Sequence, residues 1–324
     1  MRRRETTFCV LSLLTAPTVP VAQTPRPMRR IGYLHSRTIA RNHSTLVILS
    51  QAWQQLGYVE GETVFLRSAE GDARRLPALT AELIALDVGV LIVVGAAAIM
   101  ATSQITRTTP IVGIDLGIDP VRAGLAASLA RPGSNVTGLF LNQPAIVGKW
   151  VDLLREVAPD IERLAFLSDI GTGDQLEVAK AVARARGFQV AVLEVGTISS
   201  FDAALRGLSG RPRAGIAQLS VSTFTGAAAA DFAAATHKYQ LPAIVSAKSW
   251  MTPAGALMSY GPIVELYFPR AVRLADRILR GDKAGELPIE GPDRFELVID
   301  LRVAKVLALS IPQSLLLRAD ELIQ

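Results

Sequence analysis

Few residues in this sequence have the chemistry to hold a metal ion or to catalyse a reaction. It contains three histidines, His35, His43 and His237, and a single cysteine, Cys9. The histidines lack the spacing at which one element presents a pair of metal ligands. A Gly-x-Ser-x-Gly elbow, a Walker A loop and a His-Glu-x-x-His pair are also missing from the sequence. We therefore predict no metal site, no catalytic residue and no cofactor.

One short glycine pattern leaves an alternative open. Gly171-Thr172-Gly173 follows a predicted strand and opens a predicted helix, as a dinucleotide-binding fingerprint does, but Leu176 stands where the third glycine would be. The pattern therefore permits an α/β enzyme that binds a dinucleotide, or a flexible loop at the mouth of a binding site. A lone Gly-x-Gly is weak, and we favour the loop.

The stretch RPGSNVTG (131–138) allows three interpretations. It holds an Asn-Val-Thr acceptor for N-glycosylation, two glycines of the kind that cradle phosphate, and a Pro-Gly pair typical of a chain leaving a domain. The glycines do not lie between a strand and a following helix, as a phosphate loop requires. We predict that Pro132 and Gly133 end a helix begun at Pro120, and that residues 135–140 form the first strand to cross between two lobes.

The elements around these residues alternate between strand and helix. A chain of 324 residues can form two cores, since single cores usually stop growing near ~250 residues. Apolar runs and helical periodicity predict strands followed by helices in both halves, which indicates parallel sheets covered on both faces. The predicted strands are 30–34, 64–70, 88–95, 110–115, 163–169, 188–195, 214–221 and 241–247, and the predicted helices are 44–56, 76–86, 96–105, 174–187, 201–208 and 225–240.

The glycines and prolines that end helices and open strands recur at matching places in the two halves. Gly57 ends the first helix of one half and Gly187 that of the other, while Pro110 and Pro242 open the fourth strands. Both pairs are roughly 130 residues apart. A glycine after a helix supplies the left-handed cap at little steric cost. We therefore expect two similar α/β lobes.

The first residues have the layout of a secretory signal peptide. Arg2, Arg3 and Arg4 precede an apolar run from Phe8, and small residues follow up to Ala22. We predict that residues 1–22 are removed on export, the alternative being a disordered basic N-terminus of a cytoplasmic protein. The formal net charge of +5 includes these arginines, and the remaining charge is too small and too evenly spread to indicate a nucleic-acid partner. No later apolar stretch is long enough and unbroken enough to cross a membrane.

Four runs resemble a known family: LGYVEGETV (56–64), DPVRAGLAASLARPGSNVTG (119–138), LMSYGP (257–262) and the segment 286–323. They are similar to the substrate-binding proteins of ABC transporters of the tryptophan/tyrosine type, which have the type I periplasmic binding protein fold. The resemblance implies an α/β fold of two Rossmann-like lobes joined by a multi-strand hinge. Lobe 1 would span 29–138, completed by about 262–288, and lobe 2 would span 139–257, completed by about 289–324.

The resemblance also implies a ligand region between the lobes. It lies at the C-terminal ends of parallel strands, where open α/β sheets bind ligands. The implied residues are His35, Ser36, Ala96, Ala97, Asp119, Ser168, Asp169, Ser222, Thr223, Phe224, Ser246 and Trp250.

The roles of the acid and of the aromatic residues in that set each have two interpretations. Members that bind aromatic amino acids tend to have Thr-Pro where this chain has Ala96-Ala97, and acids where it has Ser222 and Ala247. That leaves Asp119 as the acid for an α-ammonium group, with Asp115 and Asp169 as candidate helpers. Asp119 either only caps the helix begun at Pro120, or caps it and contacts the ligand. Phe224 and Trp250 either stack on a ring of the ligand or pack within their lobe.

The resemblance implies a periplasmic receptor without catalytic activity. A small solute, an amino acid or a similar carboxylated molecule, would be trapped between the lobes and delivered to an ABC permease and its ATPase. We expect a monomer. A sensory binding module for a receptor is the other alternative. Rotation of the lobes is expected near Gly133, Gly138, Gly255, Gly261 and Gly291.

Overall fold

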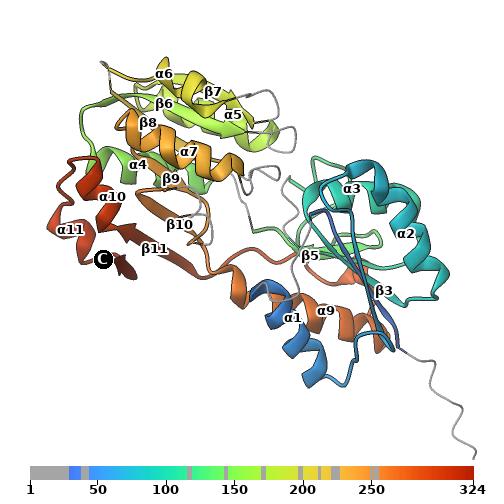
Figure 1. Ribbon diagram of the computed structural model, residues 1–324. Helices are drawn as coiled ribbons and strands as arrows, with labels where there is room; N and C mark the ends of the chain where they lie inside the picture. The colour runs from blue at the N-terminus through green and yellow to red at the C-terminus, as the bar shows by residue number, and fades with distance from the viewer. Residues whose placement is uncertain are drawn as a thin grey trace, which may run out of the picture.

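A computed structural model provides the structure of the chain. It describes residues 29–37, 44–114, 119–141, 145–168, 173–195, 200–210, 213–219, 227–248, 251 and 255–324. The predicted signal peptide, residues 1–22, lies outside the described residues. Figure 1 shows two lobes side by side, each with its own sheet and helices.

The first sheet has five parallel strands in the order β2-β1-β3-β4-β5. The central strands are buried along their whole length, which explains their continuous apolar sequences. Its strands are β1 (Ile31–His35), β2 (Val64–Ser68), β3 (Val90–Val94), β4 (Ile111–Ile114) and β5 (Val136–Leu139).

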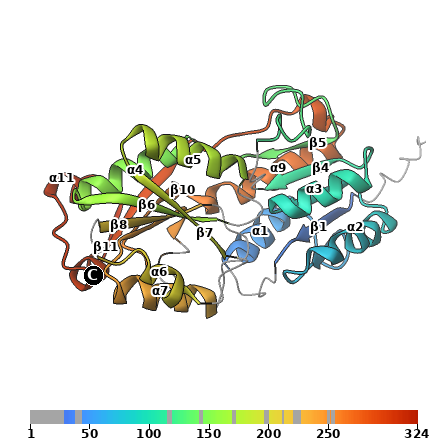
Figure 2. The same cartoon turned by 90° about the horizontal axis from the view of Figure 1, so that it is seen from above.

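Helices cover both faces of the first sheet. One face packs on α1 (Ser44–Gln55) and α9 (Phe268–Leu279), and the other on α2 (Leu76–Ala85) and α3 (Ala96–Ile105). Helix α9 comes from far along the chain, yet it packs against α1, β3 and β4 (Figures 1 and 2). The described residues also include short 3-10 helices: η1 (Ala73–Arg75), η5 (Val264–Leu266) and η6 (Ala284–Glu286).

The second sheet has seven strands in the order β12-β11-β10-β9-β8-β6-β7. Neighbouring strands are parallel except for the antiparallel pair β10 and β11. The strands are β6 (Ile161–Ser168), β7 (Gln189–Glu194), β8 (Arg213–Gln218), β9 (Ala243–Val245), β10 (Met258–Pro262), β11 (Phe295–Asp300) and β12 (Glu321–Ile323).

The second sheet is also covered on both faces. One core lies beneath α4 (Ile146–Val157), α5 (Gly173–Ala185), α10 (Leu301–Val306) and α11 (Gln313–Leu316). The other core lies beneath α6 (Phe201–Arg206) and α7 (Ala227–Lys238). Two mostly parallel sheets flanked by helices confirm the predicted α/β architecture. Among the described residues, no helix combines the length and apolar content needed to cross a bilayer.

Two predictions about residues 120–140 were wrong. Residues 120–130 form turns rather than a helix, because Gly124 adopts φ +69° and ends the helical geometry after one turn. Residues 136–139 do not cross between lobes. They form β5, the edge strand of the first sheet, parallel to β4. The predicted glycine caps were right, since Gly57 has φ +84° and Gly187 has φ +81°.

Candidate functional site

The carboxyl end of the first sheet brings together three predicted residues, His35, Ser36 and Ala96, with the neighbouring Gly95. His35 is opposite Val94 in the register of β1 and β3, so the turns after both strands meet. Ser36 lies against Gly95, where a Cβ atom would be 2.7 Å from the Ser36 hydroxyl oxygen. Gly95 has φ +94°, a conformation that favours glycine, and it caps α3 at Ala96.

Helix α3 presents its N-terminus at this edge. No side chain caps it, because the N-cap residue is Gly95. The first N–H groups of a helix have no partner within the helix, and with the helix dipole they favour an anionic group. Ala96 and Ala97 therefore offer backbone N–H groups rather than side chains to a carboxylate.

His35 is held in place rather than displayed to solvent. Its residue is 6% exposed, and its Nδ1 accepts a hydrogen bond from the backbone N–H of Arg37 at 2.9 Å. The Ser68 hydroxyl at the end of β2 donates to the Arg37 carbonyl oxygen at 2.8 Å. These bonds fix the path of the chain as it leaves β1.

Asp119 caps a turn. Its Oδ1 accepts from the N–H of Val121 at 2.9 Å and of Arg122 at 3.3 Å. The capping role predicted for Asp119 is therefore present, although the element it caps is a single turn. The carboxylate is only partly buried, and its predicted contact with a ligand stays a prediction.

In the second lobe, the structure describes two of the predicted residues. Ser168 ends β6 and is 1% exposed, and Ser246 follows β9 and is 9% exposed. Both come from the carboxyl ends of strands. The other predictions for this lobe fall outside the described residues: Asp169, Ser222, Thr223, Phe224 and Trp250.

The sequence analysis missed Gln218. It ends β8, between the strands that carry Ser168 and Ser246, and is 1% exposed. Neither polar atom of its side-chain amide has a hydrogen-bond partner among the residues that the structure describes. A glutamine inside the apolar run AGIAQL was the available signal, because a buried polar group without a partner is costly.

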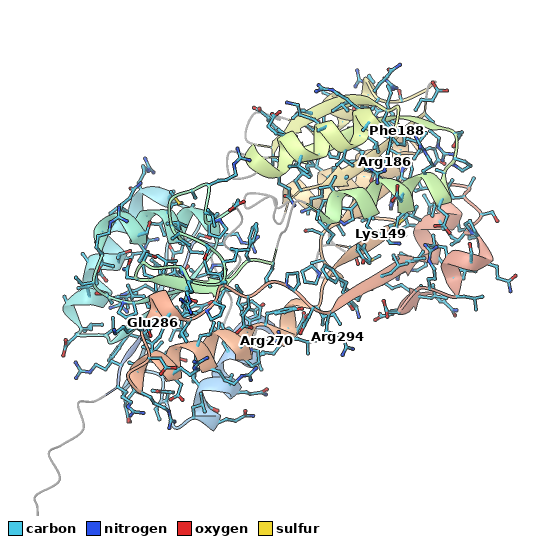
Figure 3. All side chains as sticks on the ribbon, turned by 180° about the vertical axis from the view of Figure 1, so that it is seen from behind. Lys149, Arg186, Phe188, Arg270, Glu286 and Arg294 are labelled. Carbon is cyan, nitrogen blue, oxygen red and sulfur yellow. The ribbon has the colours of Figure 1, made fainter. Side chains whose placement is uncertain are left out.

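Three connections join the lobes. Each one crosses between a residue that packs or pairs in one lobe and a residue packed in a core of the other. Leu141 belongs to a first-lobe core and Ile146 to a second-lobe core. On the second connection Pro262 pairs in the second sheet, while Tyr267 belongs to a first-lobe core. On the third, Ile289 packs in the first lobe and Leu297 in the second. In Figure 3, Arg270 and Arg294 mark the region between the lobes, with Lys149, Arg186 and Phe188 on one side and Glu286 on the other.

The five predicted hinge glycines lie inside lobes or in segments bonded to one lobe. The N–H of Gly133 bonds to the Gly285 carbonyl oxygen, Gly138 pairs with Gly113 in the first sheet, and Gly291 follows a residue bonded to β5. In the second lobe, Gly255 packs on α7 and Gly261 lies on the carbonyl oxygen of Ser246. Close packing accounts for Gly138, Gly255 and Gly261 as glycines. The structure therefore places the crossings at other residues, and rotation at the predicted glycines stays a prediction.

The electrostatics of the described residues offer no metal centre. No group of three or more His, Cys, Asp or Glu side chains within the described ranges has an arrangement that could hold a metal ion. Beside the third connection, burial raises the pKa of Glu296, and the positive charge of Lys248 opposes that shift. The charged groups at the crossings therefore interact with one another: Arg270 pairs with Asp293, and Lys248 offsets part of the burial of Glu296.

Comparisons with known proteins agree with this geometry. The sequence model of the family described as ABC transporter substrate binding protein matches residues 45–323. A tyrosine-binding protein of Clostridioides difficile (strain R20291) is 21% identical over 262 residues, covering 79% of this chain and 74% of that protein.

Solved structures share the fold over most of the chain. The crystal structure of an ABC domain from Streptococcus pneumonia in complex with L-Trp has a TM-score of 0.79 and 20% identity, covering 91% of this chain and 99% of that chain. The ligand-free, open structure of a substrate-binding protein with adhesive properties from Clostridium difficile has a TM-score of 0.66, 18% identity and the same coverages.

Proposed function

Because the chain belongs to the ABC transporter substrate-binding protein family, we propose that it is the periplasmic receptor of an importer and binds an amino acid or similar carboxylated solute between its lobes. The observation that carries the proposal is that both mostly parallel sheets bring polar residues to the carboxyl ends of their strands, with an uncapped helix N-terminus at that edge of the first sheet. Such edges are where open α/β sheets bind ligands.

The class of solute follows from the chemistry of the first lobe. The N-terminus of α3, next to the Ser36 hydroxyl, suits a carboxylate. Asp119 is the partner we propose for an α-ammonium group, since a buried ammonium needs a carboxylate. The relatives that bind tyrosine and L-Trp support an amino acid.

Closure of the lobes on the solute is the proposed mechanism. The solute would contact both lobes only when they are close, so it shifts the population toward the closed form. The proposed pivots are the crossings: between Leu141 and Ile146, at residues 263–266, and at the peptide between Arg294 and Phe295. The closed form would then dock on an ABC permease served by an ATPase, with the receptor acting as a monomer and catalysing no reaction.

Export is part of the proposal. The layout of residues 1–22 supports a signal peptide, and the protein for experiments therefore starts at residue 23. The sequence beyond residue 22 contains no cysteine, because Cys9 is the only one in the chain.

Titration calorimetry with a panel of amino acids and small acids tests the function, and small-angle scattering tests closure. We expect one solute to bind with one-to-one stoichiometry and to reduce the radius of gyration. Nicotinamide nucleotides belong in the panel as the test of the enzyme alternative. A panel without any binding solute, together with an unchanged radius of gyration, would contradict the proposal.

A further inference from the structure

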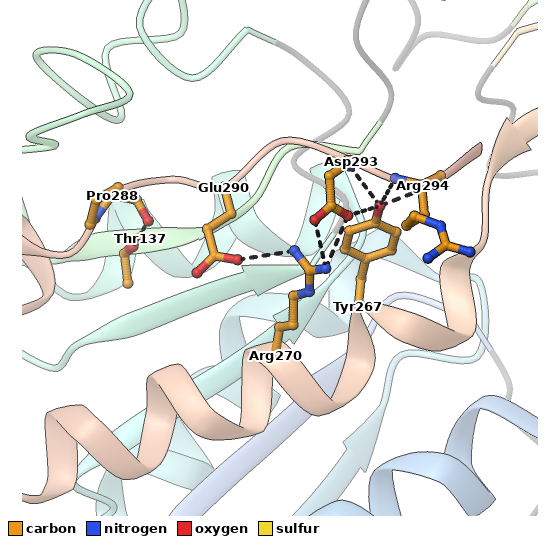
Figure 4. A network of polar contacts seen from close by, with 7 residues as sticks. All are labelled: Thr137, Tyr267, Arg270, Pro288, Glu290, Asp293 and Arg294. Atoms are coloured by element: carbon orange, nitrogen blue, oxygen red, sulfur yellow. Dashed lines mark hydrogen bonds and ion pairs between the residues drawn. The ribbon is translucent and has the colours of Figure 1, made fainter.

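Tyr267 occupies a special place on the second connection. It is the N-cap residue of α9 and is fully buried, at 0% exposure, within a first-lobe core. Its hydroxyl, however, reaches the third connection, 26 residues further along the chain (Figure 4). The residue therefore ties two of the three connections to each other.

The hydroxyl makes four hydrogen-bond contacts at that point, the longest being to the Arg294 carbonyl oxygen at 3.3 Å. It accepts from the backbone N–H of Asp293 at 2.8 Å and of Arg294 at 2.9 Å, and it donates to Asp293 Oδ1 at 3.0 Å. Arg270, one turn along α9, donates from Nη2 to both carboxylate oxygens of Asp293 at 2.9 Å. These hydrogen bonds, from Arg270 first and from Tyr267 second, lower the pKa of Asp293.

The residues before Asp293 are bonded to the first lobe as well. The Thr137 hydroxyl donates to the Leu287 carbonyl oxygen at 2.9 Å, and Ile289 N–H donates to the Leu129 carbonyl oxygen at 2.8 Å. The Glu290 N–H donates to the carbonyl oxygen of Gly138 in β5, and the Glu290 carbonyl oxygen accepts from the N–H of Phe140, just after β5. The segment 287–290 is thus a part of the first lobe.

The bonding changes immediately after Arg294. Phe295 is paired with Pro262 in the second sheet, and its ring stacks on Tyr260 with ring centroids 5.8 Å apart. Leu297, two residues on, lies in a second-lobe core. The third connection therefore passes from one lobe to the other at the Arg294–Phe295 peptide, whose carbonyl oxygen accepts from the Ile263 N–H on the second connection at 3.2 Å.

We propose that Tyr267 is a positioning residue for solute binding: its hydroxyl fastens residues 291–294 to the first lobe and so confines the third pivot to the Arg294–Phe295 peptide. Without these bonds only the Arg270 side chain would hold the segment to the first lobe, through the Asp293 carboxylate, and the flexible connection would extend from the Arg294–Phe295 peptide back toward residue 291. A longer connection gives the lobes more relative orientations, and closing them costs more conformational entropy. The inference rests on the proposed function, because the pivot matters only if the lobes close on a solute.

The test uses distances between the lobes. Single cysteines replace Gln104 on α3 and Ala181 on α5, both exposed, and carry spin labels for electron–electron distance measurements. The variants are Tyr267→Phe and, as a matched control, Tyr58→Phe. The Tyr58 hydroxyl also bonds to α9, donating to Asp276 Oδ1 at 2.8 Å, but both of its ends lie in the first lobe.

We expect Tyr267→Phe to broaden the distance distribution, and Tyr58→Phe to lower the melting temperature with the distribution unchanged. Loss of one accepting oxygen should also speed amide hydrogen exchange at Asp293 and Arg294 about fivefold to tenfold. Asp293→Ala should broaden the distance distribution less, because both backbone bonds to the Tyr267 hydroxyl remain. If Tyr267→Phe does not fold, broadening in Asp293→Ala tests the proposal in its place. Equal distributions in Tyr267→Phe and Tyr58→Phe, or unchanged exchange, would overturn the proposal.

Binding separates this inference from the proposed function. With L-tyrosine and L-tryptophan as probes, Tyr267→Phe should weaken binding severalfold and Tyr58→Phe should not. If the wild type binds no solute at all, the proposed function fails. The spin-label and exchange measurements then still decide whether Tyr267 confines the pivot.

Discussion

Gly138 in β5 lies directly on the backbone of Gly113 in β4. A Cβ atom at position 138 would be 2.0 Å from the Gly113 carbonyl oxygen and 2.6 Å from its nitrogen, and Gly138 has φ +139°. Both the space and the backbone conformation therefore require glycine. This contact fixes the last strand of the first sheet before the chain leaves the lobe.

Gly138→Ala should destabilise the protein severely, because the strand must shift away from β4 to admit the methyl group. We expect the free energy of unfolding to fall by at least ~2 kcal/mol, measured by chemical denaturation. Gly207→Ala is the control, since Gly207 has no atom closer than 4.0 Å to an added Cβ and an ordinary φ of −67°. Similar losses in both variants would contradict the argument.

Asp276→Asn should make the stability less dependent on acid pH. Burial alone would raise the pKa of Asp276, but hydrogen bonds from Arg280 and Tyr58 outweigh it, and the pKa is lowered overall. A lowered pKa means that the carboxylate stabilises the fold above the unfolded value of about 3.9, and that this contribution is lost as the pH falls below it.

Denaturation curves at several pH values check this expectation. The difference between wild type and Asp276→Asn should be about 1–2 kcal/mol at pH 7 and should shrink below pH ~4. Asp282→Asn serves as the control, because Asp282 is 45% exposed in its pair with Arg277 and exposed pairs contribute little. A difference that stays constant with pH would refute the assignment.

The fold could be predicted from the sequence because its signals are local. Helix α3 has the same bounds as predicted, and the glycines after α1 and α5 adopt the expected left-handed conformation. The turn at 120–130 could not be predicted, because a single φ at Gly124 decides it. The sequence could predict polar residues at strand ends that meet at one edge of a sheet, but their contact with a ligand stays a prediction. Gln218 was missed because it lies in an apolar run.

The hinge was the hardest part to predict. Glycine was the available signal, but Gly138 and Gly261 are glycines because neighbouring backbone lies against them. The actual crossings are set by hydrogen bonds between distant residues, such as Tyr267 with Arg294. Such bonds have no signature in the local sequence.

Glu296→Gln should stabilise the protein at neutral pH. Burial raises the pKa of Glu296, as do Glu265, Glu321 and Asp320, while Lys248 opposes them. A raised pKa favours the protonated form in the folded state, so the stability gained from it is present below the unfolded pKa of about 4.3 and is lost as the pH rises. Glutamine mimics the protonated form at every pH.

Thermal melts from pH 4 to pH 8 test this prediction. Glu296→Gln should raise the melting temperature by about 1–2 °C at pH 7, and the gain should vanish near pH 4. The exposed Glu62 in the first lobe, which is not among the groups that shift the pKa of Glu296, provides the control variant, Glu62→Gln. A lower melting temperature for Glu296→Gln at pH 7 would mean that the carboxylate has a favourable partner.

Asp119 is the residue whose charge we expect to matter for binding. Asparagine at this position keeps a side-chain oxygen that can accept from the N–H groups of Val121 and Arg122. Asp119→Asn should therefore retain the melting temperature but weaken binding of an amino acid about tenfold or more, because the α-ammonium group loses its charged partner. Asp119→Ala should lose both the turn cap and the binding.

A carboxylate with the same local role elsewhere in the lobe supplies the control. Asp72 accepts from the N–H of Arg74 at 3.1 Å and caps η1, as Asp119 caps its turn. Asp72→Asn should leave the affinity for the amino acid unchanged in titration calorimetry. If Asp119→Asn binds as tightly as wild type, the acid serves only the turn, and the ammonium partner must be sought in the second lobe.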